Sequence, residues 1–139
     1  MVGLLIVTHG DLAKSLITSA ELIVGKTPLM ESLGLYHGDD IDELMSKISS
    51  SVNQLHEQSE KGGVLILTDL FGGSPSNAAA RCIHELKETV PLECVTGVSL
   101  PMLLEVATSR EHVSLHELMQ KCLEVGRTCA IDLRERLEL

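Results

Sequence analysis

The sequence predicts an α/β protein with a doubly wound, mainly parallel four-stranded sheet that carries helices on both faces. Two nearly uninterrupted apolar runs are typical of strands buried on both faces. Segments with helical periodicity separate the strands, in the order β-α-β-α-β-α-β-α-α with short connections. With right-handed crossovers, the common strand order for such a sheet is 2-1-3-4. The 139 residues contain no repeat, linker or low-complexity tract, so residues 1–139 are expected to form a single domain.

The first half of the chain predicts two strands and two helices. Residues 3–8 form a near-continuous apolar run and are expected to be a buried strand. Apolar residues recur at helical spacing from residue 11 to about residue 24, and Gly25 is placed to end this helix. Residues 32–37 predict a short, weaker strand, and the helical period returns over residues 40–56.

The second half begins with another strongly apolar strand, over residues 64–68. Ser74 is predicted to be the N-cap of the next helix, with Pro75 at the first helical position. Residues 92–98 are expected to form the fourth strand.

Two helices and an ambiguous tail complete the predicted order. A helix is expected near residues 101–108, and a final helix begins at Ser114, whose spacing to Glu117 matches a capping box. Residues 129–139 either continue this last helix or form an edge strand that pairs with a second subunit.

Composition excludes several classes of function. The chain has one Phe, one Tyr and no Trp, and its net charge is −9. Stacking on bases and binding of a phosphate backbone both need groups that are scarce here, so no nucleic-acid partner is expected. The four cysteines lack CxxC spacing, which predicts buried, reduced thiols and no metal site. No apolar stretch reaches membrane-spanning length and no signal peptide is recognisable, so a soluble, cytoplasmic protein is predicted.

Two polar residues are expected to meet at one edge of the sheet. His9 ends the first apolar run, and Asp69 ends the one over residues 64–68. The order 2-1-3-4 places these two strands side by side, at the point where the winding direction reverses. Ligands of open α/β sheets bind beyond the carboxyl ends of the strands at this point. We therefore expect His9 and Asp69 to face each other in the functional site.

The predicted pair suits nucleophilic chemistry. A neutral imidazole attacks through the nitrogen that lacks a proton, and a carboxylate bound to the other ring N–H fixes the tautomer. Gly72 and Gly73 allow a ligand to approach the backbone closely, and the helix start at Ser74 supplies N–H groups and a hydroxyl for an anion. Thr8 either adds a second hydroxyl or simply ends the strand. These residues predict a site at which His9 carries a phosphoryl group.

Three motifs resemble a known family. They are residues 6–10 (IVTHG), 68–79 (TDLFGGSPSNAA) and 97–102 (GVSLPM), and the resemblance covers essentially the whole chain. They are similar to the enzyme IIA domain of the mannose (mannose/fructose/sorbose) class of the bacterial phosphoenolpyruvate-dependent sugar phosphotransferase system (PTS). The resemblance implies a protein-histidine phosphotransferase without a cofactor. It also implies that His9 reacts through Nε2 and that Asp69 orients and polarises it.

The same resemblance implies protein partners. His9 would take phosphate from phospho-HPr and pass it to a separate enzyme IIB chain for sugar uptake, with the membrane reached only through the permease complex. A homodimer with an exchanged C-terminal segment is implied as well. Leu70, Phe71, Pro101 and Met102 are either buried or, from their positions around the same rim, part of a partner-docking surface.

Two other functions fit part of the pattern. Related IIA domains occur inside transcription activators, so the first alternative is a PTS-responsive regulatory domain of a transcription activator. A passive module that binds a small phosphorylated ligand ranks lower, because no GxGxxG or Walker-type motif is present.

Overall fold

Strands and helices alternate along the chain, as predicted, and a one-turn helix is added at the end. The computed structural model describes residues 1–139. The strands are β1 (Gly3–His9), β2 (Met30–Leu35), β3 (Val64–Thr68) and β4 (Leu92–Thr96). The helices are α1 (Leu12–Val24), α2 (Ile41–Gln58), α3 (Ser74–Leu86), α4 (Leu100–Ser109), α5 (Leu115–Thr128) and α6 (Leu133–Leu137). None of these helices combines the length and the apolar character needed to cross a bilayer.

The four strands form one parallel sheet in the order β2-β1-β3-β4, which confirms the predicted order 2-1-3-4. In this register Val7 of β1 pairs with Thr68 of β3, and His9 pairs with Leu35 of β2. The carboxyl ends of β1 and β3 therefore lie next to each other at one edge of the sheet, and β4 keeps one side unpaired.

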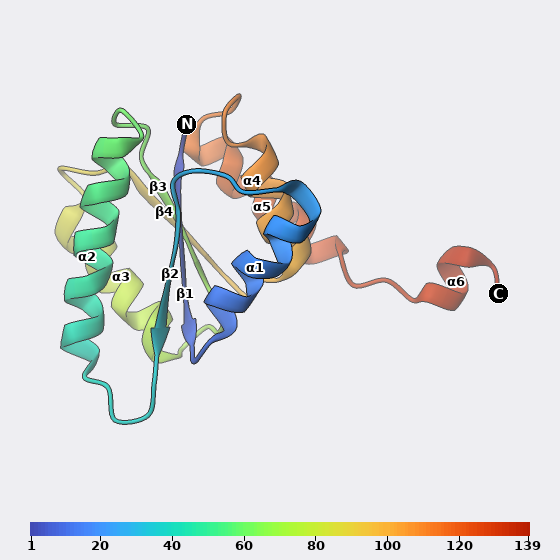
Figure 1. Ribbon diagram of the computed structural model, residues 1–139, viewed down its shortest axis with the longest axis horizontal. Helices are drawn as coiled ribbons and strands as arrows, with labels where there is room; N and C mark the ends of the chain where they lie inside the picture. The colour runs from blue at the N-terminus through green and yellow to red at the C-terminus, as the bar shows by residue number, and fades with distance from the viewer.

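Helices cover both faces of the sheet (Figure 1). Helices α1, α4 and α5 lie on one face, and α2 and α3 lie on the other. Alternate side chains of β1 enter the two cores: Leu4 and Ile6 face the first layer, and Leu5 and Val7 face the second. Because both faces of the strand are buried, its sequence is an unbroken apolar run and does not alternate between apolar and polar residues.

The predicted bounds of β2 are two residues too late. The strand starts at Met30, which pairs with Leu4 of β1. The short sequence of β2 carries only a weak strand pattern, so its first residues were not predicted. It ends at Leu35 because the next N–H, that of Tyr36, donates to the Asp39 carboxylate at 2.8 Å instead of continuing the ladder. At the fourth strand, Gly97 has a φ of 83°, which ends β4 at Thr96.

The start of α5 follows the predicted capping box. Ser114 Oγ accepts a hydrogen bond from the Glu117 N–H at 3.2 Å, and the Glu117 carboxylate accepts one from the Ser114 N–H at 3.3 Å. Helix α5 ends at Thr128, so the tail does not continue it, and the tail is not a strand of this sheet either. Residues 129–139 run away from the body of the molecule and end in α6 (Figure 1).

A buried arginine joins three segments at the amino edge of the sheet. The Arg110 guanidinium donates hydrogen bonds to the Val2 and Leu29 carbonyls at 3.2 and 2.9 Å, to Thr27 Oγ1 at 2.9 Å and to the Pro28 carbonyl. Burial lowers the pKa of Arg110 below its ordinary value. The side chain ties the end of α4 to the segments that enter β1 and β2, and nothing in the local sequence pattern predicts this role.

All four cysteines are free. Cys82 and Cys122 are buried, whereas Cys94 and Cys129 are partly exposed. Burial raises the pKa of Cys94 to about 11 and that of Cys122 to about 12, so both thiols stay protonated near neutral pH.

Candidate functional site

The structure brings His9 and Asp69 into direct contact, as the strand order predicted. His9 is the last residue of β1, and Asp69 follows directly after β3. His9 Nδ1 lies 2.8 Å from Asp69 Oδ2. The same oxygen accepts a hydrogen bond from the His9 backbone N–H at 3.0 Å. The carboxylate thus holds both the ring and the backbone of the histidine.

The electrostatics of the pair leave one ring nitrogen available. Burial by itself would raise the pKa of Asp69, but the two hydrogen bonds from His9 and the charge of its ring outweigh burial and lower that pKa. An ionised carboxylate only accepts hydrogen bonds, so this contact places a proton on Nδ1, and in the neutral imidazole Nε2 then keeps its lone pair. The His9 side chain is 48% exposed, and that of Asp69 is 13% exposed. The His9 ring is therefore accessible from solvent, whereas the carboxylate that holds it is largely covered.

The turn from β1 into α1 uses a glycine and a threonine. Gly10 has a φ of 56°, a conformation that suits glycine and lets the chain reverse directly after His9. Thr8 Oγ1 accepts a hydrogen bond from the Ala13 N–H at 2.8 Å and donates one to the His9 carbonyl at 3.2 Å. Thr8 is fully buried, and its hydroxyl is committed to the backbone. This geometry does not support the phosphate contact predicted for Thr8.

Gly73, the second residue of the glycine pair, lies directly against the His9 ring. Gly72, with a φ of 82°, lies in a turn that the Gly73 N–H closes by donating to the Leu70 carbonyl at 3.1 Å. A Cβ on Gly73 would lie 2.9 Å from His9 Cε1 and 3.6 Å from Nε2. Only glycine allows this approach without displacing the ring. The N–H of Gly73 is already used by the turn, so it is not free for the phosphate contact predicted for this residue.

The start of α3 differs from the prediction by one residue. The N-cap is Gly73, with no side-chain cap bond, and Ser74 is the first helical residue. Ser74 as the N-cap is therefore wrong, because the chain enters the helix one residue earlier than the Ser-Pro pattern indicates. The first bond of the helical ladder runs from the Asn77 N–H to the Gly73 carbonyl at 3.0 Å. The N–H groups of Ser74 and Ser76 precede this ladder and, with the positive end of the helix dipole, suit an anion.

Three of the four predicted docking residues lie at the surface. Phe71 is 87% exposed and Leu70 is 59% exposed, in the same loop as Asp69. Pro101, in the first turn of α4, is also exposed. Met102 is only 3% exposed, and its sulfur lies 2.9 Å from the position that a Cβ on Gly126 of α5 would take. The docking role predicted for Met102 is wrong, because α4 turns this side chain into the core.

Two residues near the site were missed. The Tyr36 hydroxyl donates a hydrogen bond to Asp11 Oδ1 at 2.6 Å, which links the loop after β2 to the turn after His9. This hydrogen bond to Asp11 raises the pKa of Tyr36 above its ordinary value. Ser76 hydrogen-bonds to the backbone next to Asp69. No sequence signal marks these contacts, because each joins residues whose proximity depends on the folded loops.

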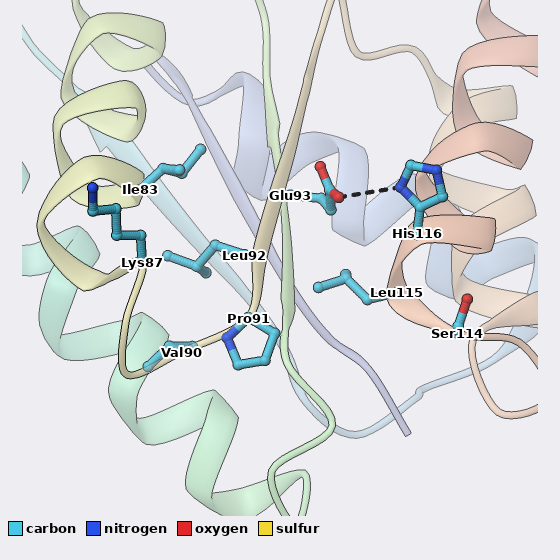
Figure 2. A pocket seen from close by; sticks show the side chains of 9 residues that line it. All are labelled: Ile83, Lys87, Val90, Pro91, Leu92, Glu93, Ser114, Leu115 and His116. Atoms are coloured by element: carbon cyan, nitrogen blue, oxygen red, sulfur yellow. Dashed lines mark hydrogen bonds and ion pairs between the residues drawn. The ribbon is translucent and has the colours of Figure 1, made fainter.

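The largest surface hollow lies away from His9. It has a volume of about 460 Å³ and opens between the end of α3, the start of β4 and the start of α5. Figure 2 shows its side chains: Glu93 of β4 faces His116 of α5, with 3.4 Å between His116 Nδ1 and Glu93 Oε1. Leu92 and Leu115 form an apolar part of the lining. This hollow is at the amino end of β4, whereas His9 and Asp69 are at the carboxyl ends of their strands.

The site is an exposed imidazole held by a carboxylate at the carboxyl edge of a parallel α/β sheet, an arrangement whose chemistry suits a histidine nucleophile. Residues 3–123 match the family described as PTS system fructose IIA component. The PTS system fructose-specific EIIA component of Bacillus subtilis (strain 168) is 35% identical over 138 residues, which cover 99% of this chain and 90% of that protein. The chain belongs to the EIIA family of the mannose/fructose/sorbose class of the PTS and is a phosphotransferase component of sugar transport.

Two further proteins show how this domain occurs elsewhere. The PTS system mannose-specific EIIAB component of Escherichia coli (strain K12) is 32% identical over 127 residues, which cover 91% of this chain and 38% of that protein. The crystal structure of the PTS IIA protein associated with the fucose utilization operon from Streptococcus pneumoniae has a TM-score of 0.80 at 28% identity, with 99% of each chain covered.

Proposed function

We propose that His9 is the phosphoryl carrier of this EIIA component. It accepts a phosphoryl group from phospho-HPr and passes this group to an enzyme IIB. The enzyme IIB in turn supplies the phosphoryl group for phosphorylation of the sugar during its uptake. The observation that carries the proposal is the 2.8 Å contact between His9 Nδ1 and Asp69 Oδ2, which leaves Nε2 as the nucleophile. Membership of the EIIA family supports the direction of the transfer.

The proposed transfer needs only the groups of the two proteins. The lone pair of His9 Nε2 attacks the phosphorus on the donor, the donor's own bond to phosphorus breaks, and its electron pair returns to the donor. The His9 ring gains positive character, which the Asp69 carboxylate stabilises through the Nδ1–H bond. Transfer to enzyme IIB is the same step with His9 as the leaving group. Positioning and charge stabilisation dominate such a reaction.

The phosphoryl oxygens are held at the start of α3. Ser74 offers its N–H and hydroxyl there, next to the Gly73 backbone that contacts the His9 ring. The space next to the Cα of Gly72 is open, so the phosphoryl group can approach the backbone there. The N-terminal end of a helix favours negative charge, so this position stabilises the transferred group.

The donor and the acceptor use one surface in turn, because each must reach Nε2 of His9. Leu70, Phe71 and Pro101 provide its exposed apolar contacts. Large apolar side chains exposed beside a reactive group are typical of protein-docking surfaces.

The protein forms a homodimer through its tail. Strand β4 pairs only with β3, so one side of it is open to a further segment. The tail carries large apolar side chains that nothing covers in a single chain: Ile131, Leu133, Leu137 and Leu139. Residues 129–139 of one subunit cover the open side of the partner's β4, which would remove both exposed features at once.

Phosphorylation by purified partners tests the carrier function. Incubation with phosphoenolpyruvate, enzyme I and HPr should give one acid-labile, alkali-stable phosphate per chain, and the ³¹P resonance should identify an Nε2-phosphohistidine. A His9→Ala variant should take up no phosphate, whereas His37→Ala, which removes an exposed loop histidine, should be labelled fully. Full labelling of His9→Ala would overturn the assignment.

Sedimentation velocity tests the dimer. The full chain should sediment as a dimer, and a chain that ends at Thr128 should sediment as a monomer. The shortened chain should still be phosphorylated at His9. A monomeric full chain at concentrations of about 100 µM would contradict the proposed interface, because obligate interfaces are usually stable well below this concentration.

A further inference from the structure

We propose that Ser76 is a positioning residue for His9, acting through the loop that carries Asp69 and Gly73. The inference rests on the proposed function, in which His9 is the residue phosphorylated. Ser76 lies in the first turn of α3 and does not contact His9 in the structure. Its effect is on the geometry of the groups that do.

The Ser76 hydroxyl binds the residues on both sides of Asp69, the side chain of Thr68 and the backbone of Leu70. Ser76 Oγ donates a hydrogen bond to the Leu70 carbonyl at 2.7 Å. It also lies 2.7 Å from Thr68 Oγ1. A hydroxyl has one proton, and the Leu70 carbonyl can only accept, so Thr68 is the donor in the second bond. Asp69 is the single residue between Thr68 and Leu70, and both of its neighbours are therefore fixed by one side chain.

The network is anchored in the core of the sheet. Thr68 is the last residue of β3 and is fully buried. Thr96, the last residue of β4, places its Oγ1 3.3 Å from Ser76 Oγ. The hydroxyl of Ser76 thus connects the ends of two neighbouring strands to the loop above them. Such a network restricts the loop more than a single backbone bond would.

The restriction reaches the His9 ring through two routes. The Leu70 carbonyl that Ser76 binds also accepts the Gly73 N–H at 3.1 Å, which closes the turn that rests against the imidazole. Asp69 itself holds the ring at Nδ1. Loss of the Ser76 hydroxyl leaves the Leu70 carbonyl with the Gly73 N–H as its one partner and removes the acceptor of the Thr68 hydroxyl. The loop that begins at Asp69 is then held less firmly. Because transfer depends on placing Nε2 in line with phosphorus, a small displacement of either contact slows the reaction.

Three variants test the proposal by rapid-quench phosphorylation with phospho-HPr. Ser76→Ala should lower the rate at saturating donor by about tenfold and leave the KM for the donor unchanged, because the docking residues are untouched. Ser76→Thr keeps the hydroxyl and should restore most of the rate. The matched control is Ser49→Ala in α2. It removes a hydroxyl that lies 3.6 Å from Cys82 Sγ of α3, away from the loop that carries Asp69. It should transfer at the wild-type rate.

A second measurement does not depend on phosphoryl transfer. The ¹⁵N spectrum of the His9 ring in the unphosphorylated protein should show a protonated Nδ1 in the wild type and a mixture of tautomers in Ser76→Ala. Wild-type transfer by Ser76→Ala, with an unchanged ring spectrum, would overturn the inference. If the wild-type protein takes up no phosphate at all, the proposed function fails, and the ring spectrum still decides whether Ser76 positions His9.

Discussion

Asp69 Oδ2 accepts hydrogen bonds from two groups of His9, the backbone N–H at 3.0 Å and the ring Nδ1 at 2.8 Å. A carboxylate that bound only the ring would leave the end of β1 free to move beneath it. Binding at both points fixes the histidine from its backbone to its reactive end. The adjacent strands β1 and β3 make this possible, because the pairing of Val7 with Thr68 brings Asp69 to within one residue of His9 along the edge of the sheet.

Asp69→Asn should slow phosphorylation of His9 by about 100-fold or more. The asparagine amide is nearly isosteric, but the single oxygen Oδ2 of Asp69 accepts both the backbone N–H and the ring N–H of His9. An amide NH₂ group in that position donates to Nδ1, loses the backbone bond and favours the tautomer with the proton on Nε2, where the lone pair is needed. An amide oxygen there keeps both bonds but lacks the negative charge that stabilises the phosphorylated ring. Single-turnover kinetics with phospho-HPr measures the effect, and calorimetry should show unchanged donor binding. Asp42→Asn, which removes the exposed partner of Arg81, serves as the control and should transfer normally. Equal rates for all three proteins would argue against an orienting role.

The stability of the protein should depend on pH through Asp69. The folded-state pKa of Asp69 lies below its ordinary value of 3.8 because His9 donates two hydrogen bonds to it. Its contribution to the free energy of unfolding is therefore fully present above the unfolded-state pKa and is lost as the pH falls through the folded-state pKa. Urea unfolding between about pH 5 and pH 2 should show a steeper loss of stability for the wild type than for Asp69→Asn. Parallel curves for the two proteins would contradict this linkage.

Gly73→Ala should separate activity from stability. The backbone at Gly73 has φ −79° and ψ 163°, which alanine adopts without strain. The added Cβ would lie 2.9 Å from His9 Cε1, so the half-exposed ring must move. We expect the transfer rate to fall about tenfold. The free energy of unfolding should stay within about 1 kcal/mol of the wild type, as measured by urea denaturation.

Gly72→Ala is the matched comparison, because it should show the opposite pattern. Its φ of 82° strains an alanine, which costs about 1 kcal/mol, but a Cβ there would meet no atom within 4 Å. The loss of rate should be smaller than for Gly73→Ala. A Gly73→Ala variant that is phosphorylated as fast as Gly72→Ala would exclude the proposed contact with the ring.

The main features of the fold and the central pair of the site could be predicted from the sequence because each depends on strong local patterns. Residues 3–8 and 64–68 are apolar throughout, since both faces of these strands are buried. Right-handed crossovers then leave few strand orders, and the order with β1 beside β3 brings His9 to Asp69. A short pattern and a topological rule were sufficient for this result.

The remaining features depend on side-chain contacts between distant segments. The exposure of Met102 is decided by the rotation of α4 about its axis, which its packing on α5 determines. Ser74 is not the N-cap because the preceding turn, closed between Leu70 and Gly73, starts the helix one residue earlier. The role of Ser76 requires the ends of β3 and β4 to lie side by side. No local sequence pattern contains this information.

Tyr36 should titrate above its ordinary pKa of 10.0, and Asp11→Asn should lower its midpoint towards that value. The Tyr36 hydroxyl donates to Asp11 Oδ1 at 2.6 Å, which favours the neutral phenol, and ionisation would place a phenolate beside a carboxylate. The chain has one tyrosine and no tryptophan, so ultraviolet absorbance during an alkaline titration reports this group alone. Asp132→Asn, in the cap of α6, should leave the midpoint unchanged. A wild-type midpoint at the ordinary value, unmoved by Asp11→Asn, would show that the loop after β2 is not held to the turn after His9 in solution.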